Sequence, residues 1–196
     1  MSRSEFRFSG FGGQGVITMC HILGHGVAIH AGMDATMTEA YGPEKTGGFS
    51  RGDLVISDEK IDYPNVVVPE LVVAFSQDAF ERDAESVAEN GLVLIERDMV
   101  DPGDFAEKRP DVTLVSLPAV ELAEEVGPKV VANVVMLGAV VEIVDSLPTE
   151  FIRDAVRETV PEGTEDLNEQ AFDRGRKAVQ DGELDEPAEK LREVIA

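Results

Sequence analysis

The sequence predicts an α/β fold with three layers, in which helices cover both faces of a mixed, mostly parallel β-sheet. The chain opens as a Rossmann domain does, with a short strand, a glycine-rich turn and an apolar helix. Continuous apolar runs, typical of strands buried on both faces, then alternate with helical patterns. From about residue 146 only helical patterns remain, and no linker or repeat divides residues 1–196. We therefore expect one domain with a helical C-terminal part.

The first strand contains Phe6 and Phe8 on one face, and a helix is expected from about residue 14 to residue 31. Between them, Gly10, Gly12 and Gly15 fit the dinucleotide fingerprint G-x-G-x-x-G. Glycines let the backbone turn tightly and approach a ligand, and a helix N-terminus offers N–H groups and partial positive charge to an anion. The motif alone is equally consistent with tight packing between strand and helix.

A second glycine-rich segment spans residues 41–53, between expected strands at 35–40 and 54–57. The segment carries both charges and too many glycines for a core position, and such loops carry function more often than packing. A turn at 58–60 follows the strand at 54–57, and residues 61–64 lead away from it. This middle portion of the chain resembles a hairpin, which would make the sheet mixed.

The remaining elements follow from apolar periodicity and cap residues. Ser76 or Asp78 is expected to cap the helix at 79–89, and Val130 is expected on the apolar face of a buried helix at 129–144. The expected strands are 71–75, 92–95 and 112–117, and the other expected helices are 118–126, one starting at 147–150, 166–180 and 187–195.

The chain is strongly acidic, with 39 acidic and 17 basic side chains and a formal charge of −22. This charge argues against nucleic acid or an anionic membrane as a partner, because phosphates would be repelled over most of the surface. Any anion site must be built locally from backbone N–H groups or a few basic side chains. No stretch is apolar enough to span a membrane, and the first residues leave no room for a signal peptide, so we expect a cytoplasmic protein.

The residues on their own give no complete catalytic set, and we expect no metal site. Cys20 is the single cysteine, so it can neither form an internal disulfide nor hold an iron–sulfur cluster alone. His21 and His25 are four residues apart and could in principle share a metal, but no third ligand lies nearby in the sequence. Asn133, within an apolar run, is expected to make a structural hydrogen bond to a neighbouring loop.

Taken in order, several short motifs resemble the gamma subunit of thiamine-dependent 2-oxoacid:ferredoxin oxidoreductases. The resemblance covers residues 6–175, beginning with Gly10-Phe11-Gly12-Gly13-Gln14-Gly15-Val16. The other matching segments are Tyr41-Gly42-Pro43-Glu44, Gly47-Gly48, Ile56-Ser57-Asp58, Ile61-Asp62-Tyr63-Pro64, Ser76-Gln77, Pro118-Ala119, Asn133 to Gly138, Asn168, Ala171, Phe172 and Gly175. The motifs at 41–44 and 62–64 are most similar to the 2-oxoglutarate branch. Thr46 stands where the family commonly has arginine.

The resemblance implies oxidative decarboxylation of a 2-oxoacid, with 2-oxoglutarate as the expected substrate, coenzyme A as co-substrate and ferredoxin as electron acceptor. It also implies that thiamine diphosphate, Mg²⁺ and 4Fe-4S clusters are held by partner alpha, beta and ferredoxin-like delta subunits, and none by this chain alone. The glycine loops would contact coenzyme A or a partner subunit. The residues expected at this site are Gly10, Gly12, Gly13, Gln14, Gly15, Glu44, Gly47 and Gly48.

Two alternatives remain open from the sequence. A stand-alone dinucleotide-binding module would use the first glycine loop, with an acid about 20 residues further on, such as Asp34 or Glu39. That scheme has no place for the second glycine-rich segment. A non-catalytic scaffold subunit differs only in that its loops would touch protein rather than ligand.

Overall fold

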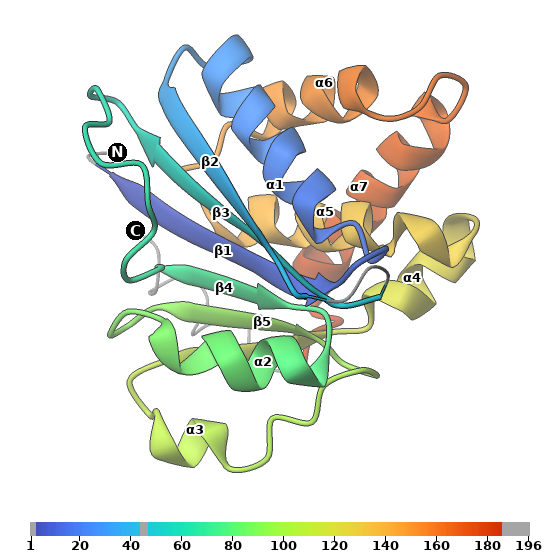
Figure 1. Cartoon of the computed structure of the whole chain (residues 1–196). Helices are drawn as coiled ribbons and strands as arrows, with labels where there is room; N and C mark the ends of the chain where they lie inside the picture. The colour runs from blue at the N-terminus through green and yellow to red at the C-terminus, as the bar shows by residue number, and fades with distance from the viewer. Residues whose placement is uncertain (1–2, 44–46, 186–196) are drawn as a thin grey trace.

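The computed structural model describes residues 3–43 and 47–185, which build six strands into one mixed sheet. The strand order is β2-β3-β1-β4-β5-β6 (Figure 1). β1, β4, β5 and β6 run parallel to one another, whereas β3 is antiparallel to both of its neighbours. The strands are β1 Ser4–Phe11, β2 Asp34–Tyr41, β3 Phe49–Ser57, β4 Leu71–Ala74, β5 Leu92–Glu96 and β6 Thr113–Leu117. The expected mixed, mostly parallel sheet is confirmed.

A hairpin is present in the middle of the chain, and its two strands are β2 and β3, which the glycine-rich segment joins. Its register pairs Asp34 with Ser57 and Tyr41 with Ser50. β3 also pairs with β1, and there Phe11 at the end of β1 lies opposite Phe49 at the start of β3. The glycine-rich connection between β2 and β3 therefore lies beside the glycine loop that follows β1, because both leave the sheet where these strands end.

Helices cover both faces of the sheet, which gives the expected three layers (Figure 1). Alternate residues along each strand point to opposite faces. Accordingly, Leu71 and Val73 of β4 belong to the core under α1, whereas Val72 and Ala74 pack toward α2. One layer contains α1 Val16–His25, α4 Ala119–Val126, α5 Ala132–Ile143, α6 Thr149–Thr159 and α7 Glu165–Asp181, and the other contains α2 Gln77–Asp83 and α3 Phe105–Lys108.

The helix α5 is buried almost all round, and only Glu142 of its twelve residues is not fully buried. Its outer side is covered by α7. The two helices approach closely because each has a glycine on the side that faces the other helix. A Cβ on Gly138 would overlap the carbonyl oxygen of Phe172, and a Cβ on Gly175 would overlap that of Val135. Only glycine permits such an approach of one backbone to another.

Several helix boundaries differ from the sequence prediction. The first helix is α-helical only to His25 and continues as one π-helical turn, Gly26–His30. The helix expected at 79–89 ends at Asp83 and is followed by a 3₁₀ turn, although Ser76 is confirmed as its cap and accepts a hydrogen bond from the Ala79 N–H.

The helix expected at 129–144 begins as a 3₁₀ turn, Lys129–Val131, before α5 starts. Because of this turn, Val130 points outward with 71% exposure, so the expectation that it lies on the apolar face is wrong. The short helix α3 was not predicted, and the expected helix at 187–195 lies outside the described residues. No helix in the described part of the chain is long and apolar enough to cross a membrane.

The close approach of α5 and α7 predicts that Gly175→Ala destabilises the protein. Alanine normally stabilises a helix interior by about 1 kcal/mol relative to glycine. Here the added methyl group would overlap backbone of α5, so we expect a loss of about 3 kcal/mol or more. Urea unfolding followed by circular dichroism measures this difference.

Gly24→Ala is the matched control, because Gly24 is also helical but its Cβ would meet only the flexible Leu54 side chain, at 3.2 Å. We expect this variant to stay within about 1 kcal/mol of the wild type. Equal stabilities of the Gly175 and Gly24 variants would contradict the proposed backbone contact.

Candidate functional site

The glycine loop after β1 takes a left-handed course into α1. Gly15 is the N-terminal cap of α1 with φ 74°, and Gly13 has φ 100°. Both values favour glycine, because other residues are strained in this region. The turn is closed by a hydrogen bond of 3.1 Å from the Gln14 N–H to the Phe11 carbonyl oxygen. The loop thus presents the first turn of α1, whose N–H groups have no partners within the helix.

The side chain of Gln14 braces this loop. Its Oε1 accepts a hydrogen bond of 2.6 Å from the Phe11 N–H, and its Nε2 donates to the Phe75 carbonyl oxygen at 3.0 Å. Gly10 lies beneath the brace, because a Cβ there would meet Gln14 Oε1 at 2.6 Å and the Phe75 Cβ at 3.1 Å. Of the predicted site residues, Gly10 and Gln14 therefore shape the loop and fix it to the end of β4.

The loop lies at a topological switch point of the sheet. From the adjacent parallel strands β1 and β4, the chain continues to α1 on one face and to α2 on the other (Figure 1). In open α/β sheets, ligands bind in the crevice outside the carboxyl ends of the strands at such a point. The fold therefore places the first glycine loop where a ligand site is expected.

The structure brings the second glycine-rich segment to the same place. The Gly12 N–H donates a hydrogen bond of 2.8 Å to the Gly48 carbonyl oxygen. A Cβ on Gly12 would lie 3.6 Å from the Gly47 N, which is ordinary contact. The structure thus joins Gly12, Gly47 and Gly48, whereas Glu44 lies outside the described residues. We call the two joined loops the glycine edge, residues 10–15 and 47–48.

Two pockets open on either side of Gly13, and Val130 lines both. The first has a volume of about 390 Å³ and lies over the first turn of α1, with Tyr41 and Asn133 in its wall. The second has a volume of about 320 Å³ and is lined by Gln14, Phe75, Met99, Val120, Lys129 and Ala132 besides the shared residues. A Cβ on Gly13 would meet nothing within 4 Å, so this glycine forms an open ridge between the two pockets.

Neither pocket is lined by a carboxylate among the described residues, although the chain carries 39 acidic side chains. The one charged side chain in the lining that is described is Lys129, which also pairs with Glu124 at 3.4 Å. Backbone N–H groups of the α1 N-terminus and this lysine are suited to an anionic ligand. An anion site on this acidic chain would have to be built locally, from backbone N–H groups and a few basic side chains of this kind.

Asn133 links the loop to the core. Its Nδ2 donates a hydrogen bond of 3.3 Å to the Gly15 carbonyl oxygen, which confirms the structural bond expected from the sequence. A Cβ on Gly15 would overlap that Nδ2 atom, so Gly15 is required both by its φ and by its neighbour. The first helical turn of α5 therefore fixes the position of the glycine edge.

Behind the second pocket lies Glu96, a buried carboxyl group at the end of β5 that the sequence analysis missed. Burial raises its pKa to about 7, although hydrogen bonds from the N–H groups of Asp98 and Val120, at 3.5 and 3.3 Å, oppose the shift. Cys20, as expected, is a buried apolar residue, and burial also raises the pKa of its thiol. A thiol of this kind is a poor nucleophile.

The neighbours of β1 argue against a dinucleotide site of the Rossmann type. That site needs an acid at the end of a parallel strand beside the first. Here the neighbour on that side is the antiparallel β3, and β2 lies one strand further out. Asp34 is at the far end of β2, and Glu39 is exposed and accepts a hydrogen bond from the Tyr41 hydroxyl.

The fold and the glycine edge together define a doubly wound α/β domain with an anion-suited crevice at its switch point. The chain belongs to the pyruvate ferredoxin/flavodoxin oxidoreductase family, whose model matches residues 5–178. A relative from Methanocaldococcus jannaschii, the 2-oxoglutarate synthase subunit KorC, is 41% identical over 88% of this chain and 92% of that protein.

Two solved structures share the fold. The gamma subunit of a keto/oxoacid ferredoxin oxidoreductase from Geobacter sulfurreducens is 31% identical, covers 90% of this chain and 96% of that chain, and has a TM-score of 0.78. The 2-oxoglutarate:ferredoxin oxidoreductase of Magnetococcus marinus has a TM-score of 0.80 at 21% identity, with 91% of this chain covering 32% of that chain. That second likeness shows the fold alone.

The buried Glu96 predicts a pH-dependent penalty on stability. Its carboxyl group is protonated in both states below its unfolded pKa of 4.5 and ionised in both above about 7. Between these values the folded state binds the proton more tightly, so this group's contribution to stability falls as pH rises. From pH 4.5 to pH 8, the unfolding free energy of the wild type should therefore fall relative to that of Glu96→Gln, by on the order of 3 kcal/mol. Urea unfolding of both proteins across this range measures it, and a constant difference would contradict the assignment.

Proposed function

We propose that this chain is the gamma subunit of a 2-oxoglutarate:ferredoxin oxidoreductase, which converts 2-oxoglutarate and coenzyme A to succinyl-CoA and carbon dioxide and reduces ferredoxin. Family membership and the likeness to a 2-oxoglutarate synthase subunit over nearly its whole length support this proposal. Neither favours a stand-alone dinucleotide-binding module. The relatives that match over most of their length are subunits of such enzymes, so in this proposal the chain acts as one component of a larger enzyme.

The partner subunits hold the cofactors in this proposal. The chain has one cysteine, and it is buried, whereas a 4Fe-4S cluster is held by four cysteine thiolates. Thiamine diphosphate, which supplies the carbanion chemistry of decarboxylation, and its Mg²⁺ are likewise assigned to partner subunits of the alpha and beta type. The clusters and the contact with ferredoxin fall to these and to a ferredoxin-like delta subunit.

The glycine edge then contributes to the coenzyme A site at the contact with those partners. The observation that carries this step is the hydrogen bond from Gly12 to Gly48, which joins both loops at the switch point beside two pockets free of described carboxylates. The N-terminus of α1 and Lys129 suit the phosphates of coenzyme A. Exposed apolar side chains at the pocket rims, Phe11, Tyr41 and Val130, suit its pantetheine arm or a partner's surface.

The division of labour predicts that the isolated chain is inactive and free of iron. Co-expression with alpha, beta and delta subunits should produce activity toward 2-oxoglutarate with an artificial electron acceptor, measured spectrophotometrically. Pyruvate under the same conditions should be a poor substrate. Turnover of 2-oxoglutarate by the purified single chain would contradict the proposal.

The glycine edge predicts a specific effect of Gly13→Ala on the assembled enzyme. The methyl group would stand on the ridge between the two pockets, and the positive φ adds strain of roughly 1–2 kcal/mol. We expect the KM for coenzyme A to rise about tenfold, with assembly and the KM for 2-oxoglutarate little changed. Steady-state kinetics and size-exclusion chromatography of the complex measure these quantities.

Gly163→Ala is the matched control, because Gly163 also has a positive φ, 87°, and open space around its Cβ, but lies in the loop before α7. It should match the Gly13 variant in stability and the wild type in kinetics. Loss of assembly in Gly13→Ala alone would favour a scaffold role for the edge, and normal kinetics in both variants would remove any role in coenzyme A binding.

A further inference from the structure

All three histidines of the chain lie within ten residues of sequence, and two of them meet a glutamate from a distant helix. The Nε2 atoms of His25 and His30 lie 2.9 and 3.1 Å from one carboxylate oxygen, Oε2, of Glu158 on α6. The three side chains offer ligand atoms that all lie within 4.8 Å of one another. We call these three residues the His–Glu cluster.

The π-helical turn is what brings the two histidines together. Residues five apart on a regular α-helix are about 140° apart around its axis and do not face each other. Here the Ala31 N–H donates to the Gly26 carbonyl oxygen at 3.2 Å, which is the i to i+5 bond of a π-helix. His25 and His30 therefore end up with ring centroids 5.7 Å apart. Single π turns within α-helices are rare and occur frequently at functional sites.

The packing of α6 completes and fixes the cluster. A Cβ on Gly26 would lie 2.9 Å from the Cα of Ile152, so only glycine allows α6 this close to the π turn. The neighbouring Phe151 stacks on the His30 ring with centroids 6.4 Å apart. The orientation of the His30 ring is thus supported by a contact that does not depend on the glutamate, as in a preformed ligand site.

We propose that His25, His30 and Glu158 form a binding site for a divalent transition-metal ion, with Zn²⁺ as the best fit. Two imidazole nitrogens and one carboxylate oxygen are a donor set that zinc takes in proteins, with a fourth position open to water. With metal–ligand bonds of about 2.0–2.2 Å, tetrahedral ligands stand roughly 3.3–3.5 Å apart. The two nitrogen–oxygen distances need to open by only a few tenths of an ångström.

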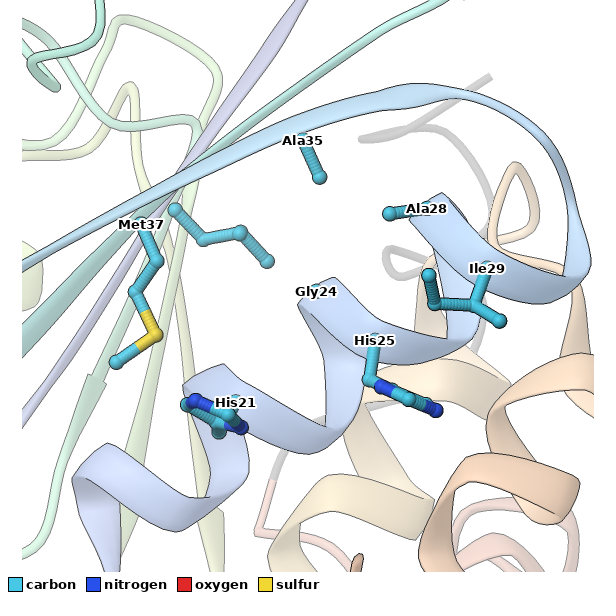
Figure 2. A pocket seen from close by; sticks show the side chains of 8 residues that line it. His21, Gly24, His25, Ala28, Ile29, Ala35 and Met37 are labelled. Atoms are coloured by element: carbon cyan, nitrogen blue, oxygen red, sulfur yellow. The ribbon is translucent and has the colours of Figure 1, made fainter. Parts of the chain in front are cut away.

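The His–Glu cluster is accessible to solvent, and the charge of the protein favours the approach of a cation. The side chains of His25, His30 and Glu158 are 34%, 21% and 52% exposed, so an ion can reach them from solvent. The net charge of −22 attracts cations to the surface. His25 also borders a pocket of about 220 Å³ between α1 and β2, in which Ala35 and Met37 face the helix (Figure 2).

His21 is not part of the site. Figure 2 shows its ring one turn before His25 on the same helix, at the pocket facing β2. His21 and His25 have the spacing of four residues that brings two side chains together on a regular α-helix. The third ligand comes instead from a residue 133 positions along the chain.

The ion would act as a clamp between the end of α1 and α6. The cluster lies at the opposite end of α1 from the glycine edge, about 15 Å along the helix. It is therefore separate from the proposed coenzyme A site, and its loss should leave the binding of coenzyme A unchanged.

Zinc titration of the full chain by isothermal calorimetry, after removal of metal with a chelator, tests the proposal. We expect one equivalent of Zn²⁺ to bind and the Tm to rise with zinc concentration, because the ion binds only the folded state. His30→Ala and Glu158→Gln should each weaken binding by at least about tenfold. Bound Co²⁺ should show the visible absorption of a four-coordinate site in the wild type and lose it in both variants.

His21→Ala is the matched control, since it removes a histidine of the same helix without touching the cluster, and it should bind zinc as the wild type does. Circular dichroism without metal should show that all three variants fold. Absence of stoichiometric zinc binding by the wild type would overturn the proposal. So would an equal loss of affinity in His21→Ala, or unchanged binding in both His30→Ala and Glu158→Gln.

Discussion

The burial of α5 is the constraint on which the rest of this structure depends. A helix that is apolar on all sides needs cover on all sides, and the sheet supplies only one of them. The C-terminal helix α7 supplies the outer cover, and it fits because Gly138 and Gly175 remove the side chains that would hold the two backbones apart. The same helix carries Asn133 in its first turn, and this amide holds Gly15. Core packing and the glycine edge are therefore parts of one arrangement.

Acidic side chains are distributed unevenly over the molecule: some form ion pairs in the interior, and none of those described lines the two pockets at the glycine edge. On the face of the sheet that α2 covers, Arg7 is buried, and its Nε lies 2.8 Å from Oδ1 of Asp53. Nearby, at the end of α2, Asp83 accepts a hydrogen bond of 2.5 Å from the Ser9 hydroxyl. Buried charges of this kind need partners, since an unpaired charge in the interior costs several kcal/mol. The described lining of the two pockets at the glycine edge has no carboxylate at all. In this acidic protein, the described acidic side chains are thus kept out of one small area at the glycine edge.

Much of the fold follows from local sequence signals. The apolar runs of β4 and β5 and the Ser76 cap each depend on residues close together in the chain, and each was predictable. The π turn was not, because nothing in Gly26–His30 distinguishes it from an α-helix, and the helix α6 that packs against Gly26 comes from a distant part of the sequence. The outward position of Val130 depends on a 3₁₀ turn, and the apolar residues around it have the pattern of a regular buried helix, so the turn was not predictable.

The candidate site likewise depends partly on local sequence motifs and partly on contacts between residues far apart in the sequence. The glycine spacing identified the first loop, but its contact with Gly48 and the pockets around it required the strand order. Glu96 could not be recognised, since its carboxyl group is buried only in the folded chain and one of its hydrogen-bond donors, the Val120 N–H, lies 24 residues further along the sequence. Glu158 was one glutamate among many until the fold placed it beside two histidines.

The π turn has a consequence for comparison among relatives. A π turn contains one residue more than the α-helical turn it replaces, so deletion of a single residue between His25 and His30 would restore a regular helix. The two histidines would then be four residues apart, about 40° around the axis of a regular helix, and would still lie on the same side. The extra residue of the π turn is therefore what lets a spacing of five bring two histidines together here, as a spacing of four does on a regular helix.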